Sequence, residues 1–157
     1  AEQTPASILV LMETIQELLP AGILNIVNGF GAEAGQALAT STRIAKIAFT
    51  GSTPVGAHIL KCAADNIIPS TVELGGKSPV IISDGFPIEL AAERIMMGKL
   101  FNAGQTCVAP DYVLLPSSRR QAFVDACIRY CQKHYQSMAD EAFSSIISER
   151  WLTGLIW

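Results

Sequence analysis

The stretch that decides the fold is Phe49-Thr50-Gly51-Ser52-Thr53-Pro54-Val55-Gly56, which separates an apolar run from an amphipathic one. The apolar run from Ile44 to Phe49 predicts a strand, and the segment from Pro54 to Ala64 predicts a helix. Gly51 between them lets a phosphate approach the backbone, and the N–H groups that open the helix attract anions. The stretch therefore predicts a strand, turn and helix unit with an anion site, although a tight turn before a capped helix explains it equally.

The same alternation of short apolar and amphipathic runs continues on both sides. Thr4 is expected to cap the first helix, with Pro5 in its first turn. Alternating strands and helices indicate an α/β architecture with a mainly parallel sheet. The remaining expected helices span Thr4–Leu19, Ala32–Ala39, Ile88–Phe101 and Arg119–Tyr135, and the remaining strands span Ile23–Val27, Ser70–Leu74, Pro79–Ser83 and Tyr112–Leu115.

Two further motifs carry the residue types of covalent acyl chemistry. The run Glu73-Leu74-Gly75-Gly76-Lys77-Ser78-Pro79 supplies a carboxylate, and Phe101-Asn102-Ala103-Gly104-Gln105-Thr106-Cys107 supplies a thiol. A thiolate attacks an electrophilic carbon, and a carboxylate can activate the water that releases the product. Without the motifs, a buried inert cysteine and a surface or ion-paired glutamate would be the ordinary interpretations.

Four segments in order resemble the aldehyde dehydrogenase superfamily: Glu2-Gln3-Thr4-Pro5, the stretch 49–56, the run 73–79 and Gly104-Gln105-Thr106-Cys107. The resemblance implies an aldehyde dehydrogenase-like α/β fold. Residues 1–75 would be the C-terminal half of a Rossmann-like cofactor domain, and residues 76–157 the beginning of the α/β catalytic domain. The Gly75-Gly76 hinge would separate them, with the reacting carbon in the cleft between the two domains.

The resemblance assigns the chemistry to two residues. Cys107 would attack an aldehyde to give a thiohemiacetal, whose hydride passes to a nicotinamide and leaves a thioester. Glu73 would activate the water that hydrolyses this thioester, and partial desolvation at the end of an apolar strand would raise its pKa. The backbone N–H of Cys107 would donate to the oxyanion, whereas the family's oxyanion Asn is expected upstream of Ala1.

The resemblance also places a dinucleotide. Ser52 would contact the pyrophosphate and Val55 would line the adenine pocket, and Gly51, Gly56 and Leu74 belong to the same cofactor site. Glu2 would accept a hydrogen bond from the adenosine ribose, which favours NAD, with NADP as the alternative. No metal is expected.

Other interpretations stay open. One is a CoA-acylating member of the family, which needs no carboxylate at the Glu73 position. Another is a catalytically silent nucleotide-binding fragment. A third open point is a composite origin, because the chain up to Pro79 resembles enzymes of aliphatic aldehydes whereas Asn102 to Leu115 resemble enzymes of coniferyl aldehydes.

Composition limits the partners. Apolar residues make up 50% of the 157 residues and charged residues only 16%, so we expect much of the surface to face other protein. We therefore expect an internal fragment of a longer enzyme, inactive alone, whose parent is a homo-oligomer. The net charge of −3, with no cluster of Lys or Arg, argues against nucleic acid or a membrane as partner. Free cysteines favour the cytoplasm.

Several other residues receive ordinary structural interpretations. Cys127, Cys131 and His134 have the spacing of half a metal site, but they are interpreted as core packing of one helix face. Cys62 is expected to pack and His58 to be a surface or hydrogen-bonded histidine. Lys77 is expected to order the hinge rather than to perform chemistry.

Overall fold

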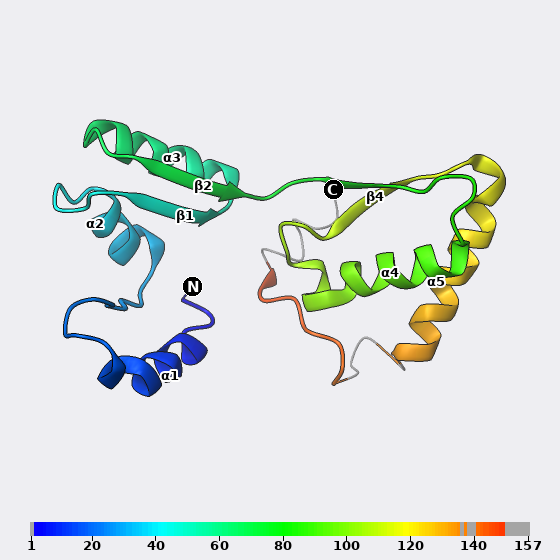
Figure 1. Ribbon diagram of the computed structural model, residues 1–157, viewed down its shortest axis with the longest axis horizontal. Helices are drawn as coiled ribbons and strands as arrows, with labels where there is room; N and C mark the ends of the chain where they lie inside the picture. The colour runs from blue at the N-terminus through cyan, green and yellow to red at the C-terminus, as the bar shows by residue number, and fades with distance from the viewer. Residues whose placement is uncertain (1, 136, 138–140, 150–157) are drawn as a thin grey trace. The chain divides into compact units, whose positions relative to one another are not determined.

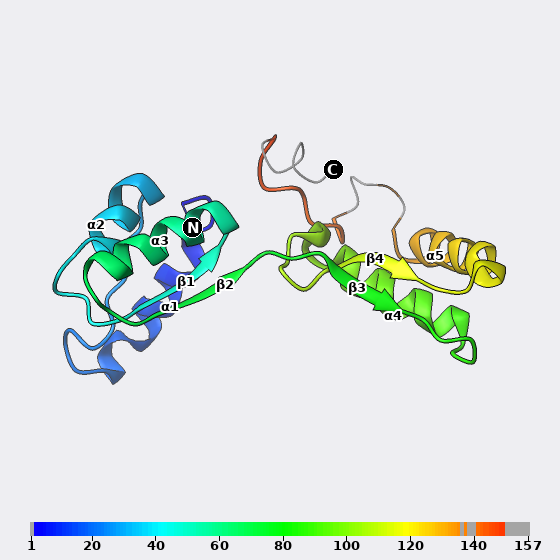
Figure 2. The same ribbon diagram turned by 90° about the horizontal axis from the view of Figure 1, so that it is seen from above.

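The chain divides into two compact units, residues 1–74 and residues 75–157, which are described separately. The computed structural model describes residues 2–135, 137 and 141–149. Each unit contains one pair of parallel strands with helices packed beside it (Figures 1 and 2). This arrangement confirms the predicted parallel α/β class.

The first unit is built around the strands β1 (Ile47–Gly51) and β2 (Ser70–Leu74). Their parallel register pairs Ile47 with Ser70 and Gly51 with Leu74. Helix α3 (Thr53–Asp65) connects the strands and packs along both of them (Figure 1). Burial alternates along each strand, as expected for strands with one covered face.

The core of the first unit is small. Ala39, Ile59 and Cys62 are buried together, with Ile47 and Phe49 packed against them. Ala39 ends helix α2 (Gln36–Ala39), which continues a π-helical turn over Gly31–Gly35. The packing interpretation of Cys62 is confirmed, since only 5% of this residue is exposed. Upstream lie α1 (Ala6–Ile15) and a 3₁₀ turn over Gln16–Leu18.

The second unit pairs β3 (Ser78–Ile81) with β4 (Pro110–Leu114) in parallel. Helices α4 (Ile88–Leu100) and α5 (Arg120–His134) pack against each other, and α4 also contacts β4 (Figure 2). The buried residues on these helices are small, Ala91 and Ala92 on α4 and Ala126 on α5, which lets the two helices approach closely. The 3₁₀ turns Phe101–Gly104 and Ser117–Arg119 follow α4 and precede α5.

A guanidinium fixes the turn between β3 and α4. The Nη1 of Arg119 donates to the carbonyl oxygens of Ser83 and Asp84, both at 2.8 Å, and its Nη2 donates to that of Phe86 at 2.6 Å. Because the fork of an arginine has fixed geometry, these three bonds tie the start of α5 to this turn.

Two sequence expectations are wrong. Residues 23–27 form no strand, because an apolar run becomes a strand only when it pairs with another, and within the described residues it has no partner strand. Thr4 does not cap the first helix: Pro5 occupies the cap position, and no side chain hydrogen-bonds there. The strand expected over Ile44–Phe49 begins and ends later, at Ile47 and Gly51, whereas β2 has the predicted bounds.

Among the residues that the structure describes, no helix combines the length and the apolar character needed to cross a membrane. Ala1 and the apolar tail 151–157 lie outside the described residues.

Candidate functional site

Five of the predicted site residues meet at the carboxyl-terminal edge of the β1–β2 pair. The register places Gly51 beside Leu74 and Thr50 beside Glu73, and Ser52 follows β1 directly. Gly56, on the first turns of α3, lies so close to Leu74 that an added Cβ would stand 2.6 Å from its Cδ2. In open parallel sheets, ligands bind outside this edge of the strands. The fold of the first unit therefore brings together the proposed base and most of the proposed cofactor residues.

The N-terminus of α3 is open at this edge. Ser52 has extended backbone angles (φ −73°, ψ 151°) as the residue before the helix, and its side chain makes no capping hydrogen bond. Its carbonyl oxygen accepts the N–H of Gly56 at 2.8 Å. Ser52 is exposed, and no side chain caps the helix, so the start of α3 is accessible to an anion.

An open groove of about 720 Å³ lies between α2, β1 and α3. Val55 and Pro54 line one side, and the backbone of Gly31 and Gly35 lines another. A Cβ added at either glycine would meet nothing within 4 Å, so the missing side chains leave the wall of the groove free. The volume falls in the range of small-ligand sites, roughly 300–1,000 Å³.

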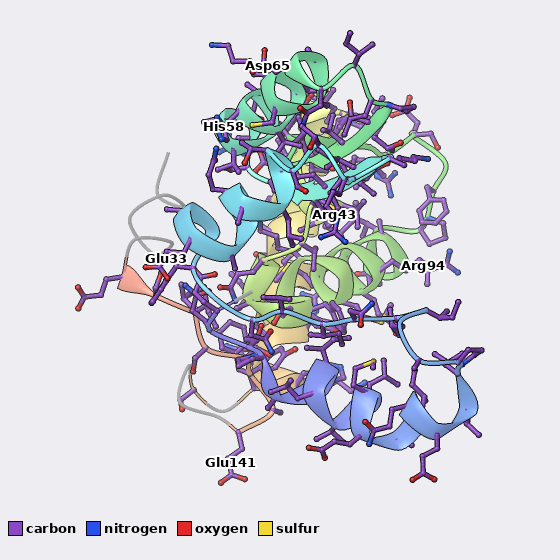
Figure 3. All side chains as sticks on the ribbon, turned by 90° about the vertical axis from the view of Figure 1, so that its left-hand side faces the viewer. Glu33, Arg43, His58, Asp65, Arg94 and Glu141 are labelled. Carbon is purple, nitrogen blue, oxygen red and sulfur yellow. The ribbon has the colours of Figure 1, made fainter. Side chains whose placement is uncertain are left out.

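His58 supplies a polar edge to this groove. This residue lies on α3 (Figure 3). Its Nε2 is 2.6 Å from Oε1 of Gln36, on α2, and 3.6 Å from Sγ of Cys62. Lys46 also lines the groove and is a positively charged residue there. The expectation that His58 is a hydrogen-bonded surface histidine is confirmed.

Cys107 is exposed on a loop with unusual backbone geometry. Before it, Asn102, Ala103 and Gly104 all have left-handed conformations, with φ of 51°, 54° and 77°. For Ala103 this conformation costs about 1–2 kcal/mol, because its Cβ crowds the following carbonyl. Strain of this kind persists where the surrounding contacts enforce it, and it is common at active sites.

The parallel β3–β4 register holds the Cys107 loop beside the glycine hinge. Ser78 pairs with Pro110, so the residues before each strand lie at the same edge, and a Cβ added to Gly76 would stand 4.0 Å from the carbonyl oxygen of Cys107. Lys77 Nζ lies 3.2 Å from Oδ1 of Asp111 and links the hinge to the start of β4. This contact supports the expected ordering role of Lys77.

Glu73 is less buried than the sequence predicts. Glu73 is exposed in this chain, so its expected desolvation is not supplied by the described residues. Glu2 is also exposed and accepts a hydrogen bond from Gln3 at 3.2 Å. Glu73 and Cys107 belong to different units, the first and the second.

The remaining cysteines lie along α5. Burial, with the neighbouring Cys131 as a second cause, raises the pKa of the Cys127 thiol above its ordinary value. A raised pKa keeps Cys127 protonated and unreactive near neutral pH. Within the described ranges, no group of three or more His, Cys, Asp or Glu side chains is arranged to hold a metal.

Sequence analysis missed two residues of this region, Gln105 and Asp111. Asp111 pairs with Lys77, and Gln105 hydrogen-bonds across the fold to residues 145 and 147. The position of Gln105 inside the cysteine motif could have indicated a functional role. Its hydrogen-bond partners could not be predicted, because they lie 40 or more positions further along the chain.

The parallel α/β fold and the exposed cysteine on a strained loop are the features expected of an enzyme that uses a cysteine as its nucleophile. The chain belongs to the aldehyde dehydrogenase family, whose model matches residues 1–150. It is similar to an acetaldehyde dehydrogenase of Pseudomonas aeruginosa, 58% identical over 82% of this chain and 26% of the relative. A probable coniferyl aldehyde dehydrogenase of the same species is 42% identical over 97% of this chain and 32% of the relative. The chain thus spans about a quarter to a third of these relatives.

Solved structures of aldehyde dehydrogenases are also similar to this chain. A lactaldehyde dehydrogenase matches with a TM-score of 0.87 at 30% identity, over 98% of this chain and 33% of that one. Betaine aldehyde dehydrogenase from Staphylococcus aureus, solved in complex with NAD+, matches with a TM-score of 0.84 at 33% identity, over 96% of this chain and 30% of that one. The similarity to both acetaldehyde and coniferyl aldehyde enzymes leaves the composite origin a prediction.

Proposed function

We propose that this chain carries the catalytic cysteine and part of the dinucleotide site of an NAD-dependent aldehyde dehydrogenase of the hydrolytic type. The observation that carries the proposal is the exposed Cys107 thiol, on a strained loop beside the glycine hinge, in a chain of this family. The substrate is an aldehyde and the product a carboxylic acid.

Cys107 Sγ forms a bond with the aldehyde carbon, and the N–H of the same residue donates to the oxygen that becomes negative. The adduct becomes a thioester when it loses its hydride, which a bound dinucleotide would accept. Glu73 then accepts a proton from the water that attacks the thioester, and the C–S bond breaks to restore the thiol. The carboxylate of Glu73 distinguishes this enzyme from a CoA-acylating one, in which CoA itself accepts the acyl group.

The first unit fits a dinucleotide. Its groove has room for an adenine against Val55, and the open N-terminus of α3 with Ser52 suits a pyrophosphate. Gly51, Gly56 and Leu74 stand at the same sheet edge, and Glu2 would favour an unphosphorylated ribose, hence NAD over NADP. NAD, when bound, supplies the hydride acceptor of the reaction.

The wider assignments belong to the same proposal. Residues 1–75 would be the C-terminal half of the NAD-binding domain and residues 76–157 the start of the catalytic domain. The protein would act in the cytoplasm as a homo-oligomer on small aldehydes, without nucleic acid or membrane as partner. Its net charge of −3 and its unpaired cysteines support this setting.

The test is Cys107→Ala in the complete protein. Loss of the proposed nucleophile should lower NADH formation from acetaldehyde by about ten-thousandfold or more. The matched control is Cys127→Ala, which removes a half-buried, protonated thiol and should retain most of the turnover. Turnover that survived the first substitution would rule out covalent catalysis by this residue.

A further inference from the structure

The side-chain amide of Gln105 makes hydrogen bonds to three residues of the second unit. Its Nε2 donates to the carbonyl oxygens of Asn102, at 3.0 Å, and of Ser145, at 3.1 Å. Its Oε1 accepts the backbone N–H of Ile147 at 2.9 Å. Both amide hydrogens and the carbonyl oxygen are thus engaged.

The two bonds to residues 145 and 147 have the pattern of a parallel β bridge. In such a ladder the N–H and C=O of one residue bond to the two residues that flank its partner. Here the side-chain amide of Gln105 replaces those groups, and Ile146 is the flanked residue. These bonds therefore connect the loop that contains Gln105 and Cys107 to a segment 40 residues away, although neither segment forms a strand there.

The segment 141–149 has a second anchor. The ring of Phe143 meets that of Tyr135, at the end of α5, edge to face with centroids 5.5 Å apart. Held at Phe143 and again at 145–147, the segment lies beside the loop that follows α4 (Figures 1 and 2). It can thus serve as a fixed support for that loop.

Gln105 also makes hydrogen bonds to Asn102, one of the residues with left-handed backbone. The carbonyl oxygen of Asn102 accepts hydrogen bonds from the backbone N–H and from Nε2 of Gln105. In return, Nδ2 of Asn102 donates to the carbonyl oxygen of Gln105 at 3.3 Å. Asn102 and Ala103 are left-handed, so they need such contacts to stay in place. Cys107 follows Gln105 by two residues.

We propose that Gln105 is a positioning residue, which holds the Cys107 loop in its strained conformation by binding the backbone at Ser145 and Ile147. Its role in turnover rests on the proposed function, since Cys107 is the nucleophile there. Its structural part stands on the hydrogen bonds alone.

The test measures amide hydrogen exchange of the complete protein. Ile147 is exposed and outside regular structure, so its N–H should be protected in the wild type only because Gln105 accepts it. Gln105→Met keeps the length and removes the amide, so exchange at Ile147 and at Ala109, whose N–H bonds within the cysteine loop, should accelerate about tenfold. Gln121→Met, which removes an exposed amide that bonds only Asp125 in the described contacts, is the matched control and should change neither.

Gln105→Glu is a second variant, which keeps the size and the polarity of the side chain in case Gln105→Met does not fold. A carboxylate oxygen still accepts the Ile147 N–H, but the donors to Asn102 and Ser145 are gone. Exchange should therefore accelerate at Ala109 and stay slow at Ile147. If Ile147 exchanges freely in the wild type, or if Ala109 is unaffected in both variants, the proposal is overturned.

Steady-state kinetics of the complete protein test whether Gln105 also matters for catalysis. Gln105→Met should lower kcat for acetaldehyde about tenfold with KM changed less than twofold, because the nucleophile is misplaced while binding persists. An unchanged kcat alongside faster exchange would refute the positioning role. A wild-type protein without turnover would count against the proposed function, whereas the exchange measurements would still decide the Gln105 bridge.

Discussion

At the scale of single residues, the accessibility of the cysteines and of Glu73 depends on surrounding residues that lie outside the sequence motifs. Cys107 is exposed and needs no opening of the fold to react, whereas Cys62 is 5% exposed and Cys127 is half-buried with a raised pKa. Cys107 is therefore the cysteine that is most accessible in this structure, since Cys131 is also only half-exposed. Glu73 is exposed as well, and its use as a base depends on what covers it.

Glu73→Gln should slow the hydrolysis step specifically. General base catalysis contributes about a hundred- to ten-thousandfold, and water is activated only after the thioester has formed. Stopped-flow measurement on the complete protein should therefore show a burst of NADH followed by slow turnover.

The matched control for this substitution is Glu89→Gln. Glu89 is an exposed carboxylate that pairs with Arg129 at 3.3 Å, and its loss should leave both phases intact. A missing burst in Glu73→Gln would place Glu73 in the activation of Cys107 instead.

At the scale of elements, the parallel β1–β2 pair and α3 do most of the assembly. The register brings Glu73 and Leu74 to the edge where Gly51 and Ser52 lead into α3. The same helix presents Val55 to the groove, whereas Leu60, further along, does not line it. One helix thus offers both a test position and a control.

Val55→Glu should weaken NAD binding by about tenfold or more. The substitution removes an apolar contact and adds a negative charge beside an anionic dinucleotide. Isothermal titration calorimetry of the complete protein with NAD would measure the change in Kd.

Leu60→Glu makes the same chemical change on the same helix, at a similarly exposed position (43% against 47% for Val55). It should leave the Kd within about threefold. Equal effects of both substitutions would mean that the groove is not the adenine site.

At the scale of the whole molecule, the described residues bury few large side chains. Their buried apolar residues are mostly alanines, and no large side chain among them is below 2% exposed. Large apolar residues such as Ile67, Ile81 and Val108 are 92%, 77% and 75% exposed. Exposed apolar surface on this scale is typical of sites that contact another protein or a ligand, and it makes a protein prone to aggregate.

The 157-residue chain expressed alone should bind the dye ANS and should not oxidise aldehydes. Exposed apolar surface binds the dye, and the family's oxyanion Asn is expected outside this sequence, a loss worth roughly a hundred- to a thousandfold. The measurement is NADH formation by the purified, monodisperse chain with aliphatic and aromatic aldehydes. The Cys107→Ala version of the chain is the control, and robust turnover that this substitution abolishes would show that the chain is a minimal enzyme.

The sequence by itself determined the α/β class, the bounds of β2 and the candidate residues, because periodicity, glycine turns and motifs are local properties. The same local logic misjudged residues 23–27 and the cap at Thr4, since strands and caps require partners elsewhere. It also did not reveal the role of Gln105, whose bonding partners are 40 and 42 positions away. Only the tertiary structure decided that Gly51, Gly56 and Leu74 meet at one sheet edge and that residues 145–147 support the cysteine loop, because hydrogen bonds between distant segments exist only once the chain has folded.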